Sequence, residues 1–331
     1  MLIPIRKAAR HIAKLLNPLP GIGFSSAAGL LSFTLDASAI MSKSRSLFQN
    51  FTVAMVYDFD GTLARGDCAE HGLMPAIGVD DAKQFWDEVK ARAKDSDADE
   101  ILTYMGYLVL SAKRANAWSE LSWESMELHG RTIPLFPGVE EWFDKINRYA
   151  IALNIRLEHY VVTSGLEAMI AGTDIAKHFV RIFGCRYHYD EETGHPKWPA
   201  VAINYTTKTQ YLFRINKGCH NSYDNDTVNK YIEPSERPIP FERMIYFGDG
   251  LTDIPAMKLV REQGGCSIGV FDSDKWQEER TQEKVEQLIS EDRVSYVVPG
   301  DYSMGEMLSV AVKGRLRKIA RTLDADHGSS I

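Results

Sequence analysis

The sequence predicts a doubly wound α/β fold, in which a parallel sheet carries helices on both faces and an α-helical segment is inserted near its start. Short, apolar, β-branched runs recur along the chain, as buried parallel strands do, and segments of helical periodicity separate them. One longer stretch, residues 67–133, has a helical pattern throughout. The runs expected to form core strands are residues 53–57, 158–162, 180–183, 244–247, 267–271 and 294–298.

The inserted segment follows the first strand directly. Apolar residues recur at three- and four-residue spacing over residues 82–94, 99–114 and 117–129, which predicts three helices. The acidic run 95–100 has a metal-binding loop as one interpretation, but acids just before an apolar periodic segment favour helix capping. A ligand-stacking surface is one interpretation of the aromatic residues at helical spacing, but we expect them to be packing residues: Trp86, Tyr104, Tyr107, Trp118, Trp123 and Trp142.

Strand and helix patterns alternate again after the insertion. Pro137 and Gly138 open an amphipathic helix that runs to about residue 149. Residues 185–189 and 200–205 flank a turn at Glu192-Thr193-Gly194, which predicts a hairpin appended to the core. The polar, turn-rich stretch 218–240 indicates an ordered surface connection. The predicted division is therefore an N-terminal extension (1–50), an α/β core (51–66 and 134–331) and the helical insertion (67–133).

Residues 1–50 have a composition of their own. They are Ser-rich and hold six Lys or Arg against a single acid, Asp36. Basic residues among Ile and Leu are typical of a targeting peptide, although Asp36 interrupts its apolar part. We favour two other interpretations: the native protein starts at Met41, whose short polar lead precedes the first strand, or the extension is disordered.

Charge and composition exclude several classes of protein. The net charge is −7, and residues 51–331, with 32 Lys or Arg and 44 Asp or Glu, carry −12, so nucleic acid is not an expected partner. The four cysteines are far apart and lack zinc-type spacing, as expected for reduced thiols in a cytoplasmic protein. No apolar run reaches 18 residues, so no transmembrane segment is expected. The sequence does not predict the oligomeric state.

Two carboxylates follow the first strand, in Asp58-Phe59-Asp60-Gly61-Thr62-Leu63. Ligands bind at the carboxyl edge of a parallel sheet, and the alternation of the two acids directs both into one crevice. A carboxylate with a pKa of about 3.9 is ionised at neutral pH and needs no base to act as a nucleophile. It also repels a phosphate dianion, because two unit charges ~4 Å apart at an effective dielectric of ~20 interact by about 4 kcal/mol. A divalent cation and a lysine are therefore expected beside it.

A second acidic turn follows the strand predicted at residues 244–247. Gly248-Asp249-Gly250-Leu251-Thr252-Asp253 carries two acids four residues apart, and its glycines let the backbone turn tightly toward a bound ion. Ligands that are all oxygen atoms favour Mg²⁺.

Two candidate phosphate-binding residues lie between the acidic turns. Thr163 ends the second predicted strand, and its hydroxyl is expected to bind a phosphoryl oxygen together with the backbone N–H groups of Ser164 and Gly165 at a helix start. Lys208 begins another predicted helix, where the helix dipole disfavours a cation unless an anionic partner such as Asp58 and a phosphate is near. Lys217 is the alternative active-site lysine.

In this order, the two acidic turns, Thr163 and Lys208 resemble the four motifs of the haloacid dehalogenase (HAD) superfamily. The resemblance implies a Rossmann-like core in which Asp58 is the nucleophile and binds Mg²⁺ together with the backbone carbonyl of Asp60. It also implies that Asp60 is the general acid and base, that Asp249 is the main distal metal ligand, and that Asp253 ligates directly or through water. Dehalogenases lack the second aspartate of the first motif, so phosphoryl chemistry is favoured.

The place of the insertion adds to this resemblance. The superfamily inserts its cap between the first and second motifs, and the hairpin after the third strand resembles the phosphoserine-phosphatase-like branch. Asp67 stands nine residues after Asp58, where phosphoserine phosphatases carry a substrate-binding glutamate. The resemblance therefore implies that Asp67 contacts the substrate, with an acid at the hinge of the cap as the alternative.

The expected function is Mg²⁺-dependent hydrolysis of a small phosphorylated metabolite through an aspartyl-phosphate on Asp58. A phosphomutase or phosphotransferase is the nearest alternative, because it would use the same two aspartates and differ in the acceptor of the phosphoryl group. A non-catalytic regulatory binding protein on the same fold is the alternative from another class. A cytoplasmic location is expected, with a targeted protein as the alternative.

Overall fold

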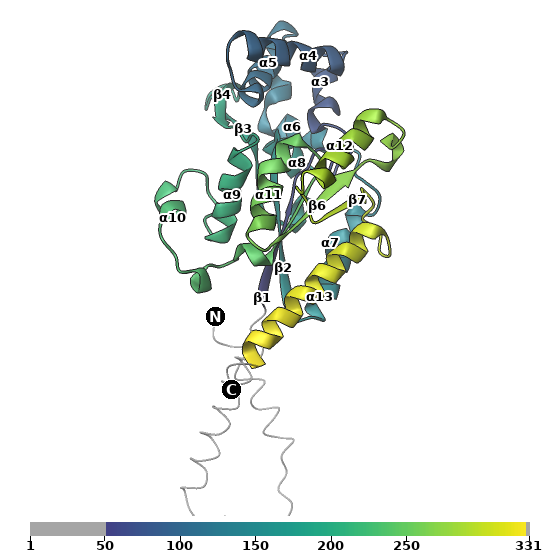
Figure 1. Cartoon of the computed structure of the whole chain (residues 1–331). Coiled ribbons are helices and arrows are strands. Elements are labelled where there is room, and N and C mark those ends of the chain that lie inside the picture. Colours follow the sequence, from purple (N-terminus) through teal and green to yellow (C-terminus); the bar gives the residue numbers. More distant parts are fainter. Residues whose placement is uncertain (1–50, 329–331) are drawn as a thin grey trace, which may run out of the picture. The chain divides into compact units, whose positions relative to one another are not determined.

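The computed structural model describes residues 51–328, with side chains up to residue 323 (Figure 1). In this range the chain forms a seven-stranded sheet in the order β4-β3-β2-β1-β5-β6-β7. Every neighbouring pair is parallel except β3 and β4. The chain builds outward from β1 in one direction and then in the other, which confirms the predicted doubly wound α/β fold. The strands are β1 (Phe51–Tyr57), β2 (Ile155–Leu166), β3 (Phe179–Tyr189), β4 (Pro196–Val201), β5 (Met244–Gly248), β6 (Cys266–Phe271) and β7 (Tyr296–Pro299).

Helices accompany the sheet along its length (Figure 1). The α-helices of this part are α7 (Val139–Ile151), α8 (Glu167–Ala171), α9 (Thr207–Asn216), α10 (Asn225–Asn229), α11 (Ile254–Glu262), α12 (Glu279–Ser290) and α13 (Met307–Gly328). α7 packs on β2, α11 on β5 and β6, α12 on β6 and β7, and α13 on β7. The short 3₁₀ helices are η3 (Ala176–His178), η4 (Pro234–Glu236), η5 (Phe241–Arg243), η6 (Leu251–Asp253) and η7 (Ser273–Lys275).

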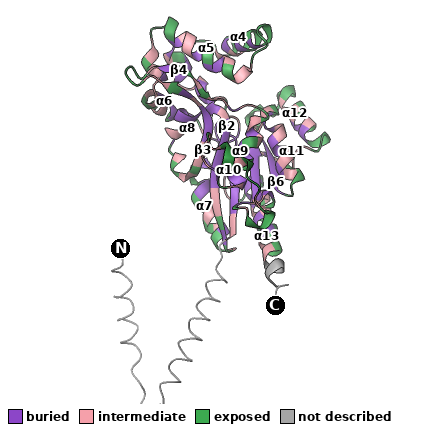
Figure 2. Ribbon diagram, turned by 90° about the vertical axis from the view of Figure 1, so that its left-hand side faces the viewer, coloured by how far each residue is buried: buried purple, intermediate pink, exposed green. Residues whose placement is uncertain are grey.

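The central strands are buried, as Figure 2 shows. Residues 53–57 of β1 are fully inaccessible to solvent. At the end of β1, the Tyr57 ring stacks on Phe247 and its hydroxyl accepts a hydrogen bond from Trp142 Nε1 at 2.9 Å. Trp142 is a packing residue, as expected. These packed aromatic rings fix the end of β1, and Asp58 is the next residue in the chain.

The start of α7 requires a glycine. Gly138 has φ 76°, and a Cβ atom there would lie 2.4 Å from the backbone nitrogen of Ser303. Only glycine meets both constraints. The helix then buries one face against the sheet, through Val139, Trp142, Phe143, Ile146 and Ala150. The predicted helix after Pro137 and Gly138 is confirmed.

The inserted segment contains four α-helices and two 3₁₀ helices. They are η1 (Cys68–Glu70), α3 (Leu73–Ala76), α4 (Ala82–Asp95), α5 (Glu100–Arg114), η2 (Trp118–Leu121) and α6 (Trp123–Gly130). The side chain of Asp99 accepts a hydrogen bond from the backbone N–H of Leu102, so this acid of the run 95–100 caps a helix as predicted. The single helix expected over 117–129 is wrong: Ser122 ends η2 and caps α6. The short helix α3 was not predicted.

The hairpin differs from the prediction in its strands. The runs 180–183 and 185–189 form one strand, β3, which continues through Gly184. Glycine is needed there because the backbone of Glu167 lies 2.9 Å from the position that a Cβ atom of residue 184 would occupy. The second strand is β4 at 196–201 rather than 200–205. The predicted turn is confirmed, since the Asp190 carboxylate accepts the backbone N–H groups of Glu192 and Thr193.

The stretch 218–240 is ordered, as predicted, and Arg214 holds its first part. The Arg214 guanidinium is completely buried and donates hydrogen bonds to the backbone carbonyls of Asn221, Ser222 and Asp224. The expectations for the extension and for Met41 lie outside the described residues. Over the described range, no helix has the length and apolarity that a membrane crossing requires.

Candidate active site

The ends of three neighbouring strands bring the candidate residues together. The backbone N–H of Asp58, just after β1, donates to the carbonyl of Phe247 in β5 at 2.8 Å. On the other side β1 pairs with β2, which carries Thr163. Because the three strands are parallel, their carboxyl ends share one edge of the sheet, and the side chains that follow them meet there.

Lys208 reaches this edge from α9 and joins two of the carboxylates. Its Nζ lies 2.7 Å from Asp58 Oδ2 and 2.7 Å from Asp253 Oδ1, and the side chain is completely buried. Burial lowers the pKa of Lys208, but the two carboxylates more than offset this and the pKa is raised. Burial and then Asp253 raise the pKa of Asp58 to about 7, although Lys208 opposes that rise. Lys208 is therefore a fixed positive charge beside Asp58.

Lys217 does not lie at Asp58. It stands at the end of α9, and its Nζ donates to the backbone carbonyls of Val228 and Lys230 at 2.6 Å and 2.7 Å. Of the two candidate lysines, Lys208 is the one that the fold brings to the carboxylates.

Both oxygens of Asp253 are occupied by hydrogen-bond donors. Oδ1 accepts from Lys208 Nζ at 2.7 Å and from the Tyr246 hydroxyl at 2.6 Å. Oδ2 accepts from the backbone N–H groups of Asp249 and Gly250, each at 3.2 Å. These donors lower the pKa of Asp253 despite its burial. Four donors therefore contact the two oxygens of Asp253, so this carboxylate fixes Lys208 and the turn.

The site offers an all-oxygen donor set to a cation. One carboxylate oxygen each from Asp58, Asp249 and Asp253 lie within 4.8 Å of one another. Gly61 leaves room for this set, because a Cβ atom there would lie 2.4 Å from Asp249 Oδ2. Burial raises the pKa of Asp249, and the ammonium of Lys284 opposes that rise. This concentration of buried negative charge fits a hard divalent cation such as Mg²⁺.

Asp60 is turned toward the inserted segment rather than toward Lys208. Its Oδ1 accepts from the backbone N–H of Cys68 at 2.7 Å, and its Oδ2 lies 3.7 Å from Cys68 Sγ. Burial, then Asp67, then Asp58 hold the pKa of Asp60 well above its usual range. A raised pKa favours the protonated carboxyl, which is the form that a general acid needs.

Thr163 and Asp60 converge on Gly165. A Cβ atom at Gly165 would lie 2.7 Å from Asp60 Oδ2 and 3.4 Å from Thr163 Oγ1. The expected helix start at Ser164 is wrong: β2 continues to Leu166 and α8 begins at Glu167. The Thr163 hydroxyl accepts a hydrogen bond from the backbone N–H of Gly165 at 3.1 Å. This N–H group therefore already has a partner within the protein.

Among the described residues, Thr62 and Ser164 each have a buried hydroxyl that lacks a protein partner. Ser164 Oγ and Thr62 Oγ1 are both buried and make no hydrogen bond. A buried hydroxyl without a partner costs free energy, about 1–3 kcal/mol, and is able to bind an incoming polar group.

Asp67 lies next to Asp60 at the start of the insertion. Its side chain caps η1 by accepting the backbone N–H of Ala69 at 2.9 Å. Carboxylate oxygens of Asp60 and Asp67 and Cys68 Sγ lie within 4.8 Å of one another. Burial raises the pKa of Asp67 to about 7. The position is consistent with either expectation, substrate contact or a hinge acid.

Four residues of the site were not predicted. The backbone N–H of Cys68 donates a hydrogen bond to Asp60, and the Tyr246 hydroxyl donates one to Asp253. Lys284 Nζ lies 2.8 Å from Asp249 Oδ2. The Tyr104 hydroxyl donates to the carbonyl of Ser164 at 2.9 Å. Tyr104 is also a buried packing residue, as expected. No local sequence pattern marks any of these roles. The contacts of Lys284 and Tyr104 join segments that are far apart in the chain. The contacts of Cys68 and Tyr246 depend on how the turns after β1 and β5 fold.

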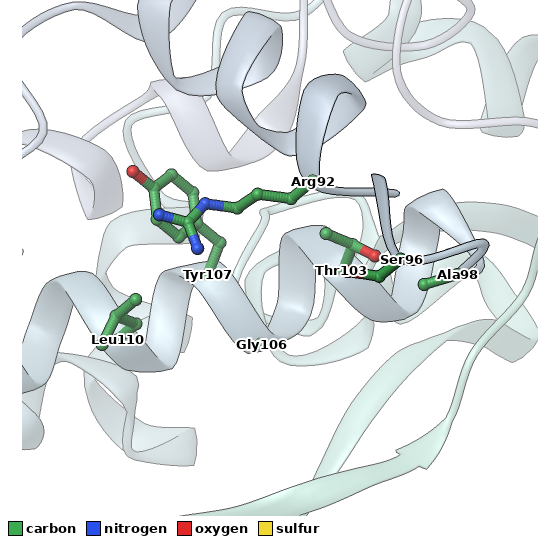
Figure 3. A pocket seen from close by; sticks show the side chains of 7 residues that line it. All are labelled: Arg92, Ser96, Ala98, Thr103, Gly106, Tyr107 and Leu110. Carbon is green, nitrogen blue, oxygen red and sulfur yellow. The ribbon is translucent and has the colours of Figure 1, made fainter. Parts of the chain in front are cut away.

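The hollow in Figure 3 is separate from these carboxylates. It lies within the inserted segment, has a volume of about 250 Å³ and contains none of the candidate site residues. Its lining comes from α4, α5 and the turn between them: Arg92, Ser96, Ala98, Thr103, Gly106, Tyr107 and Leu110.

Comparison with known proteins gives distant similarities. No family model matches the chain. A protein of Borreliella burgdorferi described as uncharacterized is 28% identical over 233 residues, which are 63% of this chain and 78% of that protein.

Several solved structures are also similar to this chain. Similar structures include a phosphoserine phosphatase in its apo form (14% identity, TM-score 0.45, 74% of this chain and 92% of that one). A probable phosphoserine phosphatase from Vibrio cholerae is 12% identical, with a TM-score of 0.46, over 82% of this chain and 66% of that one. A phosphoserine phosphohydrolase-like protein from Francisella tularensis is 16% identical, with a TM-score of 0.44, over 78% of this chain and 98% of that one.

Proposed function

We propose that this chain is a Mg²⁺-dependent phosphatase of the HAD superfamily, of the phosphoserine-phosphatase-like branch, that hydrolyses a small phosphomonoester. The observation that carries the proposal is the buried ion-pair chain Asp58–Lys208–Asp253, with 2.7 Å at each contact. Lys208 offsets the negative charge of a carboxylate that must approach a phosphate, which is the condition for using an aspartate as a nucleophile.

In the first step, an oxygen of Asp58 would attack the phosphorus atom. The bond from that oxygen to phosphorus forms as the bond from phosphorus to the alcohol oxygen breaks. Asp60, whose raised pKa favours the protonated form, gives its proton to the departing oxygen and the alcohol leaves. Thr163 and the unpartnered hydroxyl of Ser164 are candidates to bind phosphoryl oxygens.

In the second step, water would attack the phosphorus atom of the aspartyl-phosphate. Asp60, now ionised, takes a proton from the water, the bond between phosphorus and the Asp58 oxygen breaks, and inorganic phosphate leaves. Asp58 and Asp60 thus return to their starting states.

The metal would be held by Asp58, Asp249 and the backbone carbonyl of Asp60. Asp253 would act through water, because donors already occupy its oxygens. When bound, Mg²⁺ would offset the charge of the phosphoryl oxygens and of the nucleophile. The helical segment 67–133 would act as a cap that excludes water and contacts the substrate near Asp67.

The test is turnover of p-nitrophenyl phosphate by the purified chain with Mg²⁺, with EDTA, and after Asp58→Asn. Circular dichroism establishes that the variant folds. Activity that needs both the metal and Asp58 supports the proposal. Activity that persists both in EDTA and in the Asp58→Asn variant would refute it.

Release of inorganic phosphate separates a phosphatase from a phosphomutase or phosphotransferase. With water as the sole acceptor, a phosphatase releases one phosphate for each ester cleaved. Ester cleavage that depends on an added alcohol, with less than one inorganic phosphate released for each ester cleaved, favours a transferase. A folded wild-type protein that turns over neither this ester nor a panel of phosphorylated metabolites favours the non-catalytic binding protein.

A further inference from the structure

Lys284 forms an ion pair with Asp249. Its Nζ lies 2.8 Å from Asp249 Oδ2, and the two side chains are 30% and 27% exposed. Lys284 comes from α12, which the buried side chains of Val285 and Leu288 anchor to the sheet. The ammonium is therefore presented to the site by a packed helix rather than by a loop.

This pair completes the charge balance of the carboxylates. Lys208 is shared between Asp58 and Asp253 and makes no ion pair with Asp249. Among the described residues, Lys284 is the one that forms an ion pair with Asp249, so its loss would leave this carboxylate without an ion-pair partner. Lys284 thus supplies the positive charge that the third carboxylate needs while no metal is bound.

The ammonium contacts a carboxylate that a metal would also need. Lys284 Nζ lies at Asp249 Oδ2, and Asp249 belongs with Asp58 and Asp253 to the carboxylate cluster that could hold a metal ion. A cation in the site and the Lys284 ammonium would therefore bind to the same carboxylate and repel each other.

We propose that Lys284 is an internal counter-cation that competes with the metal for Asp249. This positioning residue lowers the affinity for the metal and stabilises the metal-free protein. The inference rests on the metal site of the proposed function, but it concerns a residue that the reaction itself does not use.

The experiment compares Lys284→Gln with wild type in full-length, metal-free protein. Titration calorimetry with MgCl₂ alone measures the dissociation constant, and thermal melting with and without Mg²⁺ measures stability. The variant is expected to bind Mg²⁺ about two- to fivefold more tightly, the range that a partly exposed ion pair can supply. Its metal-free form melts at a lower temperature, and added Mg²⁺ raises that temperature more than in wild type.

Two control variants isolate the effect of this contact. Lys258→Gln makes the same charge change on α11, where Lys258 pairs with Glu262 on the surface, and should leave the dissociation constant unchanged. Lys284→Arg keeps the positive charge and should bind Mg²⁺ no more tightly than wild type. Unchanged or weaker Mg²⁺ binding by Lys284→Gln would overturn the inference, since an orienting lysine gives that result. A wild type that binds no Mg²⁺ would instead overturn the metal requirement of the proposed function.

Discussion

The hydroxyl of Tyr104 in α5 donates a hydrogen bond to the backbone carbonyl of Ser164, 2.9 Å away in β2. This contact links the inserted helices to the strand that carries Thr163. Ser164 also adjoins Gly165, against which Asp60 packs. The position of α5 and the shape of the site are therefore connected through a single backbone carbonyl.

Removing this hydroxyl should weaken both stability and activity. Tyr104→Phe leaves the Ser164 carbonyl without its donor, so the free energy of unfolding should fall by about 0.5–1.5 kcal/mol. The value of kcat/KM for p-nitrophenyl phosphate should fall with it. Urea denaturation and steady-state kinetics measure the two effects. Tyr107→Phe is the matched control on the same helix, because the Tyr107 hydroxyl bonds to Glu88 within the insertion. Equal losses of kcat/KM in both variants would contradict the role of the contact with Ser164.

A methyl group at Gly165 should displace the proposed acid. The Cβ atom of Gly165→Ala would lie 2.7 Å from Asp60 Oδ2 and 3.0 Å from Cys68 Sγ, so at least one of them must move. We expect kcat to fall by about 100-fold, because general acid–base catalysis contributes about 10²–10⁴-fold. Gly106→Ala is the control: no atom lies within 4 Å of its Cβ position, and in the interior of α5 it should stabilise the protein by about 0.5–1 kcal/mol. A Gly165→Ala variant of wild-type kcat would show that Asp60 tolerates the shift.

Loss of Lys208 should be costly even apart from catalysis. Lys208→Met leaves Asp58 and Asp253 as buried carboxylates without their shared cation, and breaking such a pair costs about 3–5 kcal/mol. Chemical denaturation in EDTA measures this cost, and activity should be lost. Lys217→Met tests the other candidate lysine, whose contacts are two backbone carbonyls, and should keep its kcat. The reverse pattern of activities would assign the role to Lys217.

The parts of the fold that local patterns determine were predictable from the sequence. The apolar runs, the Asp99 cap and the turn after Asp190 are readable because neighbouring residues specify them. The continuity of β3 through Gly184 was not predictable, because it depends on the approach of Glu167 from another segment.

The same distinction applies to the site. The order of the motifs predicted that Asp58, Thr163, Lys208, Asp249 and Asp253 belong together, and the fold brings them to one edge of the sheet. The sequence could not predict that four donors contact Asp253 or that Lys284 contacts Asp249. Those facts depend on packing between α9, β5 and α12. The catalytic roles of these residues stay predictions.

The pH dependence of stability should expose the raised pKa of Asp67. Burial raises this pKa from 3.8 to about 7 in the folded protein. Between pH 4 and pH 7 the folded state then binds more protons than the unfolded state, so the free energy of unfolding falls as pH rises. One such group contributes a slope of at most about 1.4 kcal/mol per pH unit. Above pH 7 its contribution becomes constant.

Asp67→Asn should reduce this slope in metal-free protein. The amide oxygen can still accept the backbone N–H of Ala69, so the cap of η1 is retained while the ionisable group is removed. Urea denaturation in EDTA at several values from pH 4.5 to pH 7.5 measures the slope for the variant and for wild type. Asp80→Asn, at an exposed position in the same inserted segment, should leave the slope as it is in wild type. A slope that Asp67→Asn does not change would mean that Asp67 ionises as readily in the folded protein as in the unfolded chain, and the acid beside Asp60 would then carry a full negative charge at neutral pH.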